Sequence, residues 1–284
     1  MKRPLLIVML TLAGALAIGL AVAALVVLRG LYDVGATTQH TQPVYTLLEL
    51  TLKRAVRVRA ADIVVPPLAE PDRVARGAAC YRDHCAQCHG APGVAPGPVG
   101  TSMQPLPGPL VDASRRWHER ELYWITRHGI RMSGMPAWGM RLADADLWAI
   151  VAFLSRLPDL SPADYAQGLA ALDGARCPLP SGDSEEEPLG KRPPDESAQL
   201  ALRQYACVAC HRIPGVTGSD ANVGPPLDGL ARRRLIAGRL PNTPENLARW
   251  IRVPQQVKPG SAMPDLGVTE AHARVMAEYL SRLH

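Results

Sequence analysis

The stretch Cys85-Ala86-Gln87-Cys88-His89 has a second copy in the chain, Cys207-Val208-Ala209-Cys210-His211. Both copies follow the pattern C-x-x-C-H. A thioredoxin-type redox pair needs no histidine at the next position, and a four-cysteine zinc site pairs its C-x-x-C units about 15–20 residues apart. Here 118 residues separate Cys88 from Cys207. The pattern therefore favours two separate sites, in each of which a histidine acts together with its own two cysteines.

C-x-x-C-H is the attachment signal for a c-type haem. Two thiols three positions apart can reach the two vinyl groups of one porphyrin as thioethers, while the adjoining histidine turns its imidazole onto the iron. The sequence resembles that of a dihaem cytochrome c. It predicts two covalently bound c-type haems, held by two sets of residues: Cys85, Cys88 and His89, and Cys207, Cys210 and His211.

Length and composition favour small domains. The chain has 284 residues and a single Phe, so ordinary side chains would give domains of about 90 residues only a thin core. A haem buried in each domain would supply the missing apolar volume. The formal net charge is +5, and no basic run is interleaved with stacking aromatics in the way that single-strand binders require. Nucleic acid is therefore not expected as a partner.

The N-terminal region contains an unbroken apolar run of 24 residues from Leu5 to Leu28. As a helix this run would span about 36 Å, which is enough to cross a bilayer. The alternative is a cleaved secretory signal, whose apolar region is usually about 7–15 residues long. We expect an uncleaved, single-pass anchor. Lys2 and Arg3 predict that the N-terminus lies in the cytoplasm and that the rest lies on the periplasmic side of the bacterial inner membrane.

The expected fold class is mainly α, with an N-terminal transmembrane helix and two small all-α cytochrome c domains. The proposed division is a transmembrane anchor (1–30), a juxtamembrane segment (31–69), a first cytochrome c domain (70–158), a Pro-rich acidic linker (159–194) and a second cytochrome c domain (195–284). The juxtamembrane stretch Val44 to Val58 looks helical and ends at Pro66 and Pro67. It is either a spacer helix or a surface that docks on another membrane subunit.

In each domain one helix leads into the C-x-x-C-H motif and another closes the domain. The expected helices are Asp72 to Cys88, with Asp72 as N-cap, and Asp144 to Leu157 in the first domain, and Ser197 to Ala206 and Thr269 to Leu283 in the second. Thr269 is the expected N-cap of the last helix. In the cytochrome c family a small residue lies where the first helix crosses the last. The resemblance assigns this position to Gly77.

A second axial ligand decides whether the iron serves as a carrier or a catalyst. A methionine sulfur raises the reduction potential and closes the iron to other ligands. Met263, 52 residues after His211, lies in a loop that resembles the Met-Pro loop of mitochondrial-like cytochromes c. Met135 precedes Pro136, Ala137 and Trp138, which resembles the ligand loop of bacterial monohaem domains. Met132 is its alternative, while Met103 and Met140 are assigned to core filling. The predicted iron ligands are His89, Met135, His211 and Met263.

The ring nitrogen of each histidine that faces away from the iron needs a hydrogen-bond partner. The family resemblance implies a proline carbonyl from a Gly-Pro-x-Leu segment. The stretch 224–227 follows that pattern and assigns the role to Pro225, whereas 108–110 lacks the intervening residue and assigns it to Pro109. Trp138 and Trp250 are either donors to the haem propionates or core residues.

Two cysteines remain outside the motifs, Cys80 and Cys177. An oxidising compartment favours a disulfide between them, which would tie the segment after the first domain back onto it. The alternative is that Cys80 is a small apolar residue of the core. The sequence leaves both open.

Residues 240–251 and 258–264 resemble the cytochrome c domain fused to subunit II of caa3-type cytochrome oxidases. The sequence has no cupredoxin-like domain and no cysteine and histidine cluster for a dinuclear copper centre, so we expect a different protein from that subunit. The resemblance implies an electron-transfer protein without catalysis of its own. Its expected partner is a terminal oxidase or another membrane respiratory complex. The alternatives are an electron-accepting subunit of a periplasmic dehydrogenase, with a soluble cytochrome or dehydrogenase as partner, and a dihaem peroxidase.

Overall fold

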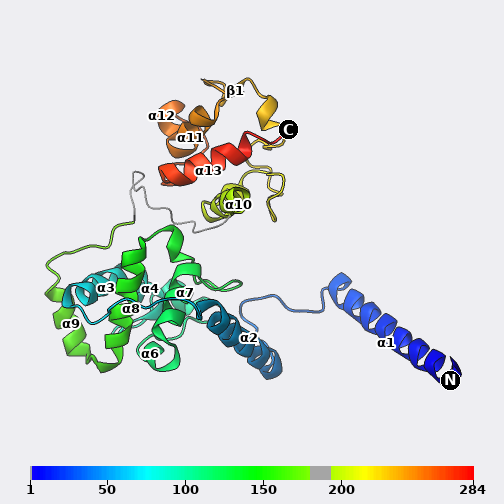
Figure 1. The fold of residues 1–284 in the computed structure, drawn as a ribbon, viewed down its shortest axis with the longest axis horizontal. Helices are drawn as coiled ribbons and strands as arrows, with labels where there is room; N and C mark the ends of the chain where they lie inside the picture. Colours follow the sequence, from blue (N-terminus) through cyan, green and yellow to red (C-terminus); the bar gives the residue numbers. More distant parts are fainter. Residues whose placement is uncertain (1, 180–192) are drawn as a thin grey trace.

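The computed structural model describes residues 2–179 and 193–284 (Figure 1). The chain is mainly helical, which confirms the expected fold class. The acidic cluster of the predicted linker lies outside the described residues. The helical elements before it are α1 (Lys2–Leu28), α2 (Gln42–Ala60), α3 (Pro71–His84), α4 (Ala86–His89), α5 (Pro98–Thr101), α6 (Ala113–Arg116), α7 (Glu119–His128), η1 (Trp138–Met140), α8 (Asp144–Arg156), η2 (Leu157–Asp159) and α9 (Pro162–Ala170).

The helical elements after the undescribed segment are α10 (Pro194–Gln204), η3 (Cys207–Ala209), η4 (Leu230–Arg232), α11 (Pro244–Arg252), α12 (Pro254–Val257) and α13 (Glu270–Leu280). The described residues also form one short antiparallel hairpin, β1 (Leu235–Ile236) with β2 (Leu240–Pro241), in which Ile236 pairs with Leu240.

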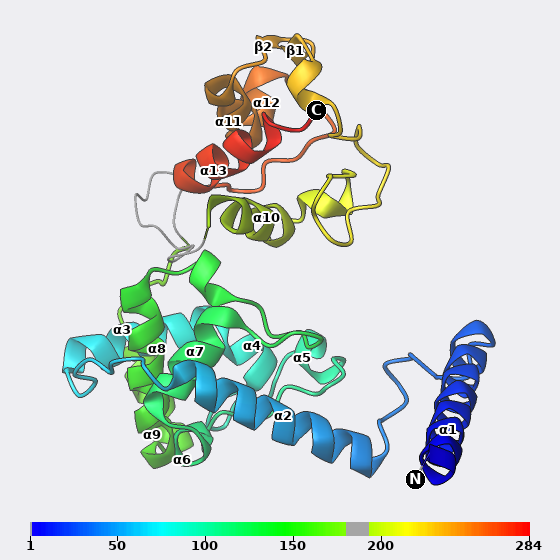
Figure 2. The ribbon, with the colours of Figure 1, turned by 45° about the vertical axis from the view of Figure 1, so that its right-hand side comes forward.

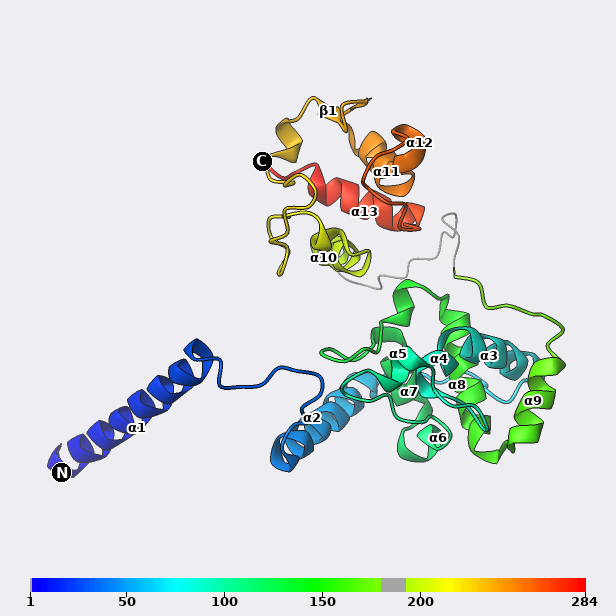
Figure 3. The same cartoon turned by 180° about the vertical axis from the view of Figure 1, so that it is seen from behind.

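Helix α1 is long and apolar enough to cross a membrane. Arg3–Leu28 has a mean hydropathy of 2.7, and none of its most apolar stretch is buried against the rest of the protein. It stands apart from the other helices (Figures 1 and 3). This helix is therefore the candidate for the expected single-pass anchor.

Helix α2 is attached to the first domain through its C-terminal half. Val56 and Ala60 are fully buried, and Arg57 Nε lies 3.7 Å from Glu121 Oε1 of α7. Arg120 of α7 donates a hydrogen bond of 3.2 Å to the Ala61 carbonyl. The helix therefore ends at Ala60, where it meets α7, and the expectation that Pro66 and Pro67 end it is wrong. The apolar side chains of its N-terminal half are exposed.

Helices α3 and α8 cross at Gly77. A Cβ atom placed on Gly77 would lie 1.9 Å from the carbonyl oxygen of Ala149, so only a glycine allows the two backbones to approach this closely. Helix α3 begins at Pro71 with Glu70 as N-cap, which corrects the expected cap at Asp72. The reason is that proline is favoured at the first helical position, where its missing N–H costs no hydrogen bond.

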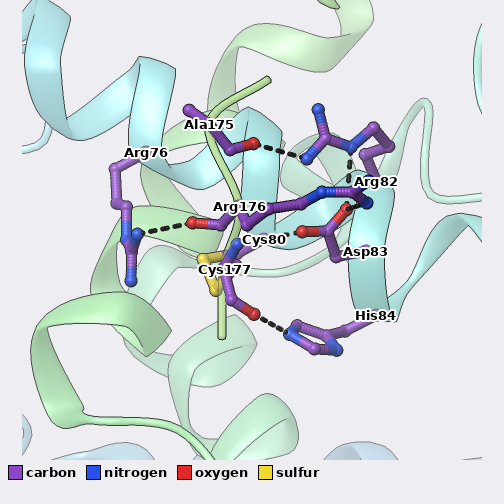
Figure 4. Close-up of polar contacts among 8 residues, drawn as sticks. All are labelled: Arg76, Cys80, Arg82, Asp83, His84, Ala175, Arg176 and Cys177. Atoms are coloured by element: carbon purple, nitrogen blue, oxygen red, sulfur yellow. Dashed lines mark hydrogen bonds and ion pairs between the residues drawn. A yellow bond between two sulfur atoms is a disulfide. The ribbon is translucent and has the colours of Figure 1, made fainter. Parts of the chain in front are cut away.

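The stretch between α9 and Cys177 packs on α3, although the sequence assigned it to the linker. Cys80 and Cys177 form a disulfide (Figure 4). Around it, Arg76 Nη1 donates to the Arg176 carbonyl at 2.9 Å, and Arg82 Nη2 donates to the Ala175 carbonyl at 2.6 Å. These bonds hold the segment along one face of α3, so that residues 159–177 of the predicted linker are attached to the first domain.

The second domain is built around α10, α11 and α13 (Figure 2). Ala198, Ala201, Ala273 and Ala277 are buried where α10 meets α13, and their small side chains let these helices approach. The side chain of Thr269 accepts a hydrogen bond of 3.3 Å from the His272 amide, which confirms the predicted N-cap. Helix α13 ends at Leu280, three residues before the predicted end at Leu283.

Candidate haem-attachment sites

The first C-x-x-C-H motif forms a single helical turn directly after α3. The amide of His89 donates to the Cys85 carbonyl at 3.0 Å, which brings the two ends of the motif together. Cys85 and Cys88 are free thiols. Burial raises the pKa of Cys85 to about 12, so its side chain is a neutral thiol at physiological pH. Two thiols and one imidazole thus lie on one turn.

The ring of His89 is fixed by a backbone carbonyl of the loop that follows the motif. Its Nδ1 lies 2.7 Å from the carbonyl oxygen of Gly108. The expected partner, Pro109, has its carbonyl bonded to Arg116 at 3.3 Å instead. The assignment to Pro109 is therefore wrong by one residue, because the segment lacks the residue between Pro and Leu and its carbonyls are shifted in register. The hydrogen bond leaves Nε2 of His89 for a metal.

The second motif repeats this geometry. The amide of His211 donates to the Cys207 carbonyl at 2.9 Å, and Nδ1 of His211 lies 2.7 Å from the carbonyl oxygen of Pro225. This is the contact that the resemblance implied. Cys207 and Cys210 are free thiols, and burial raises the pKa of Cys207 to about 11. Both motifs therefore present the same donor set with the same histidine nitrogen held.

A glycine beside each motif lets the following loop pass closely, and sequence reasoning missed this role. A Cβ on Gly224 would lie 2.5 Å from Cε1 of the His211 ring, and a Cβ on Gly100 would lie 2.7 Å from the Cα of Cys88. The amide of Gly224 donates to the Cys210 carbonyl at 2.7 Å. The loop therefore lies flat against the imidazole and fixes its plane. The position of Gly224 directly before Pro225 was the available signal.

The two methionine loops share a local feature that was also missed. In the sequence Ser-x-Met-Pro, the Met135 amide donates to Ser133 Oγ at 3.1 Å, and the Met263 amide donates to Ser261 Oγ at 3.3 Å. Gln255 Nε2 further holds the Met263 carbonyl at 2.7 Å. Each serine therefore fixes the backbone of its methionine. No hydrogen bond joins either methionine to the histidine of its domain among the described residues.

The remaining candidates near the first loop lie in different places. The side chain of Met132 is 92% exposed, so it would have to leave the solvent to serve as a ligand, while Met135 is half-buried. Met103 packs against Gly134 of the same loop. Met135 stays the predicted ligand. The rings of Trp138 and His84 lie 5.0 Å apart, and Trp250 is partly buried against the core of the second domain.

Buried His272 is a titratable group that the motifs do not include. Its Nδ1 lies 2.9 Å from Tyr205 Oη, and its Nε2 is buried without a hydrogen-bond partner in the described part of the chain. Burial, and then the positive charge of Arg141, lower the pKa of His272 to about 4. The ring is therefore neutral in the folded protein at physiological pH.

This lowered pKa predicts an acid-dependent loss of stability. The unfolded chain takes up a proton at His272 near the ordinary pKa of about 6.5, whereas the folded protein does so only near pH 4. The free energy of unfolding should thus fall as the pH is lowered through this window, by up to about 3 kcal/mol. Urea unfolding at pH 7.5 and 4.5 measures it. We expect His272→Gln to have a smaller pH dependence, and the exposed control His284→Gln to behave as wild type; an unchanged slope in His272→Gln would contradict the assignment.

The donor set in each motif fits a covalently attached haem. Four thiols are free in two pairs, each histidine has Nδ1 engaged and Nε2 left over, and Gly224 lets the loop pass close to the His211 ring. Thioether formation needs the thiols, and iron binding needs the neutral imidazole nitrogen. Burial lowers the pKa of His89, which favours that neutral form, although the bond to Gly108 opposes the shift.

Comparisons with known proteins agree with this chemistry. Residues 72–154 match the family model of cytochrome C oxidase, cbb3-type, subunit III. Cytochrome c oxidase subunit 2 of Alkalihalophilus pseudofirmus is 39% identical over 83 residues, which are 29% of this chain and 23% of that protein. The same subunit of Bacillus sp. (strain PS3) is 32% identical over 87 residues, covering 29% of this chain and 24% of that protein. The chain thus spans about a quarter of the length of these relatives.

The comparison with solved structures found no significant match. The matched range 72–154 includes the first motif and the crossing of α3 with α8, and it lies almost wholly within the predicted first domain. The resemblance to cytochromes of terminal oxidases is therefore confirmed, and the protein contains a cytochrome c domain, related to those cytochromes, of the kind that binds haem c covalently.

Proposed function

We propose that this protein is a membrane-anchored dihaem c-type cytochrome that transfers electrons to or within a terminal oxidase complex on the periplasmic face of the bacterial inner membrane. The observation that carries the proposal is the repeated motif geometry. The cytochrome c family match covers the first motif, and the second motif has the same thiol pair, the same backbone closure and a histidine held through Nδ1. This likeness supports a second haem.

Each residue has a defined task in this proposal. Cys85 and Cys88, like Cys207 and Cys210, form the thioether tethers. Gly108 and Pro225 orient the two histidine rings through their carbonyls, which leaves Nε2 of each ring available to bind the iron. Met135 and Met263 would supply the methionine sulfur as the second iron ligand in each domain. A haem c bound in this way supplies a one-electron couple, and the protein residues set its potential and its exposure.

The oxidase partner is supported by what the relatives are called, cytochrome c oxidase subunits, together with the candidate membrane span α1. A tethered donor near the membrane meets an embedded partner at a high effective concentration. The dehydrogenase alternative would use the same two haems in the opposite direction. A peroxidase needs one open iron, and two fixed Ser-x-Met-Pro loops oppose that reading.

The first test is haem content. A pyridine haemochrome assay with mass spectrometry should find two acid-resistant haems in the wild-type chain, since thioethers survive acid extraction. The Cys207→Ala/Cys210→Ala variant should keep one, and Cys85→Ala/Cys88→Ala should keep the other. A single haem in the wild type, or haem that acid extracts, would reject the dihaem proposal.

The second test concerns the sixth ligand and the partner. Met263→His should lower the potential of one haem, because imidazole stabilises ferric iron more than a thioether does. If electrons pass through the second domain, oxidation of the pre-reduced protein by oxidase-containing membranes should slow. Met132→His, at an exposed methionine, is the control and should change neither potential. Loss of oxidation of one periplasmic substrate upon gene deletion, with oxygen consumption intact, would favour the dehydrogenase alternative.

A further inference from the structure

The segment 138–141 touches both domains at residues that lead into the two C-x-x-C-H motifs. It comprises the turn η1 and Arg141, and it follows the predicted ligand Met135 by three residues. We call residues 138–141 the bridge segment. Its two ends make different contacts.

At its first end, the bridge segment meets the residue before Cys85. The Trp138 and His84 rings lie 5.0 Å apart at an interplanar angle of 45°. His84 is itself held, because its Nε2 lies 2.7 Å from the Cys177 carbonyl beside the disulfide (Figure 4). The first motif therefore begins at a fixed aromatic contact with the bridge segment.

At its other end, the bridge segment contacts the second domain. The guanidinium of Arg141 lies 4.3 Å from the centre of the Tyr205 ring, and its Nη2 donates to the Gln204 carbonyl at 3.1 Å. Tyr205 is buried and precedes Cys207 by two residues. Met140 is 6% exposed and belongs to the hydrophobic cluster of the second domain, not to that of the first. The contact thus combines apolar burial, a cation–π interaction and a charged hydrogen bond.

We infer that the bridge segment holds the two domains together at the residues that precede Cys85 and Cys207, and that electrons pass between the two haems across this contact. The inference rests on the proposed dihaem function. In this step one electron leaves one site and arrives at the other, so that one iron is oxidised as the other is reduced; no bond forms or breaks. The rate of such electron transfer falls steeply with the distance between the two haems, so fast transfer requires the two domains to be in contact.

Arg141 is accordingly a positioning residue, and its replacement separates docking from haem binding. Arg141→Ala removes a partly desolvated cation–π contact and a charged hydrogen bond. Together these losses should lower the equilibrium constant for contact between the two domains roughly tenfold or more. Arg141→Lys keeps the charge but loses the planar fork, so it should fall between. Arg131→Ala removes the same charge from an exposed position of the first domain and serves as the control.

The experiment uses the full chain in detergent with both haems bound. The internal electron-transfer rate is measured after photoreduction of one site in dilute protein, and the potential of each haem is measured by titration. We expect Arg141→Ala to slow internal transfer about tenfold or more, and Arg131→Ala to leave it unchanged. If Arg141 acted only through the effect of its positive charge on the haem potential, Arg141→Lys would keep the wild-type rate of internal electron transfer. That result would overturn the inference.

Amide hydrogen exchange gives an independent readout of docking. The amides of Tyr205 and Ala206 should exchange faster in Arg141→Ala, while those of α3 and α8 should be unchanged if the first domain still folds. Unchanged exchange at Tyr205 would show that the contact does not form in solution, and faster exchange with an unchanged rate would show that electrons take another path; each overturns the inference. A count of one haem per chain would instead reject the dihaem function, together with the inference.

Discussion

Replacing Cys80 and Cys177 by alanine is expected to lower the free energy of unfolding of the first domain by about 4–5 kcal/mol. The disulfide closes a loop with a sequence separation of 97 residues, which includes the first motif, both predicted ligands of the first haem and helix α8. Its loss frees that whole loop in the unfolded chain, and the entropy gained there favours unfolding. The native contacts around it, such as that of Asp83 with the Cys177 amide, remain.

Chemical unfolding of ferric protein without added thiol measures this loss, since a reductant would also change the iron. The matched control is Cys80→Ala alone, in which the freed Cys177 thiol is alkylated; it should be as unstable as the double variant. The hydrogen bonds of Arg76 and Arg82 to this segment should keep it on α3 in both variants. Equal stability of wild type and double variant would therefore mean that the disulfide does not form in the folded protein.

Gly77→Ala is expected to destabilise the first domain by about 3 kcal/mol, although alanine favours helix by about 1 kcal/mol over glycine. The added methyl group would lie 1.9 Å from the Ala149 carbonyl oxygen and 2.9 Å from Phe153 Cβ. Both neighbours belong to the fully packed helix α8, so α3 and α8 have to separate. We expect the loss to appear both in thermal unfolding and in reduced haem incorporation, because α3 positions Cys85.

Gly168→Ala provides the matched control for this crossing. Gly168 lies within helix α9, and a Cβ there would meet no atom within 4 Å. The same substitution should therefore be neutral or stabilising by up to about 1 kcal/mol. If Gly77→Ala were as stable as Gly168→Ala, the helices would be able to adjust and the close crossing would not be a requirement of the fold.

The sequence by itself determined the features that depend on short spacing. C-x-x-C-H places two thiols and an imidazole on one turn whatever surrounds it, and the structure has this turn twice. The apolar run at the N-terminus predicts a helix of membrane length, and α1 is that helix. The same applies to α8 and to the cap at Thr269, because helical periodicity and capping depend on residues within one or two turns. The resemblance added the small residue at the helix crossing.

The tertiary structure decided what depends on residues far apart in the chain. Pairing of Cys80 with Cys177 was open from the sequence, because a spacing of nearly one hundred residues does not fix a distance. The carbonyl that holds His89 is that of Gly108, since one residue fewer in the loop shifts its register. Met140, assigned to core filling, fills the core of the other domain. The contact of Arg141 with Tyr205 likewise follows from the docking of two surfaces, which no local pattern encodes, because packing selects partners by shape and charge after the helices have formed.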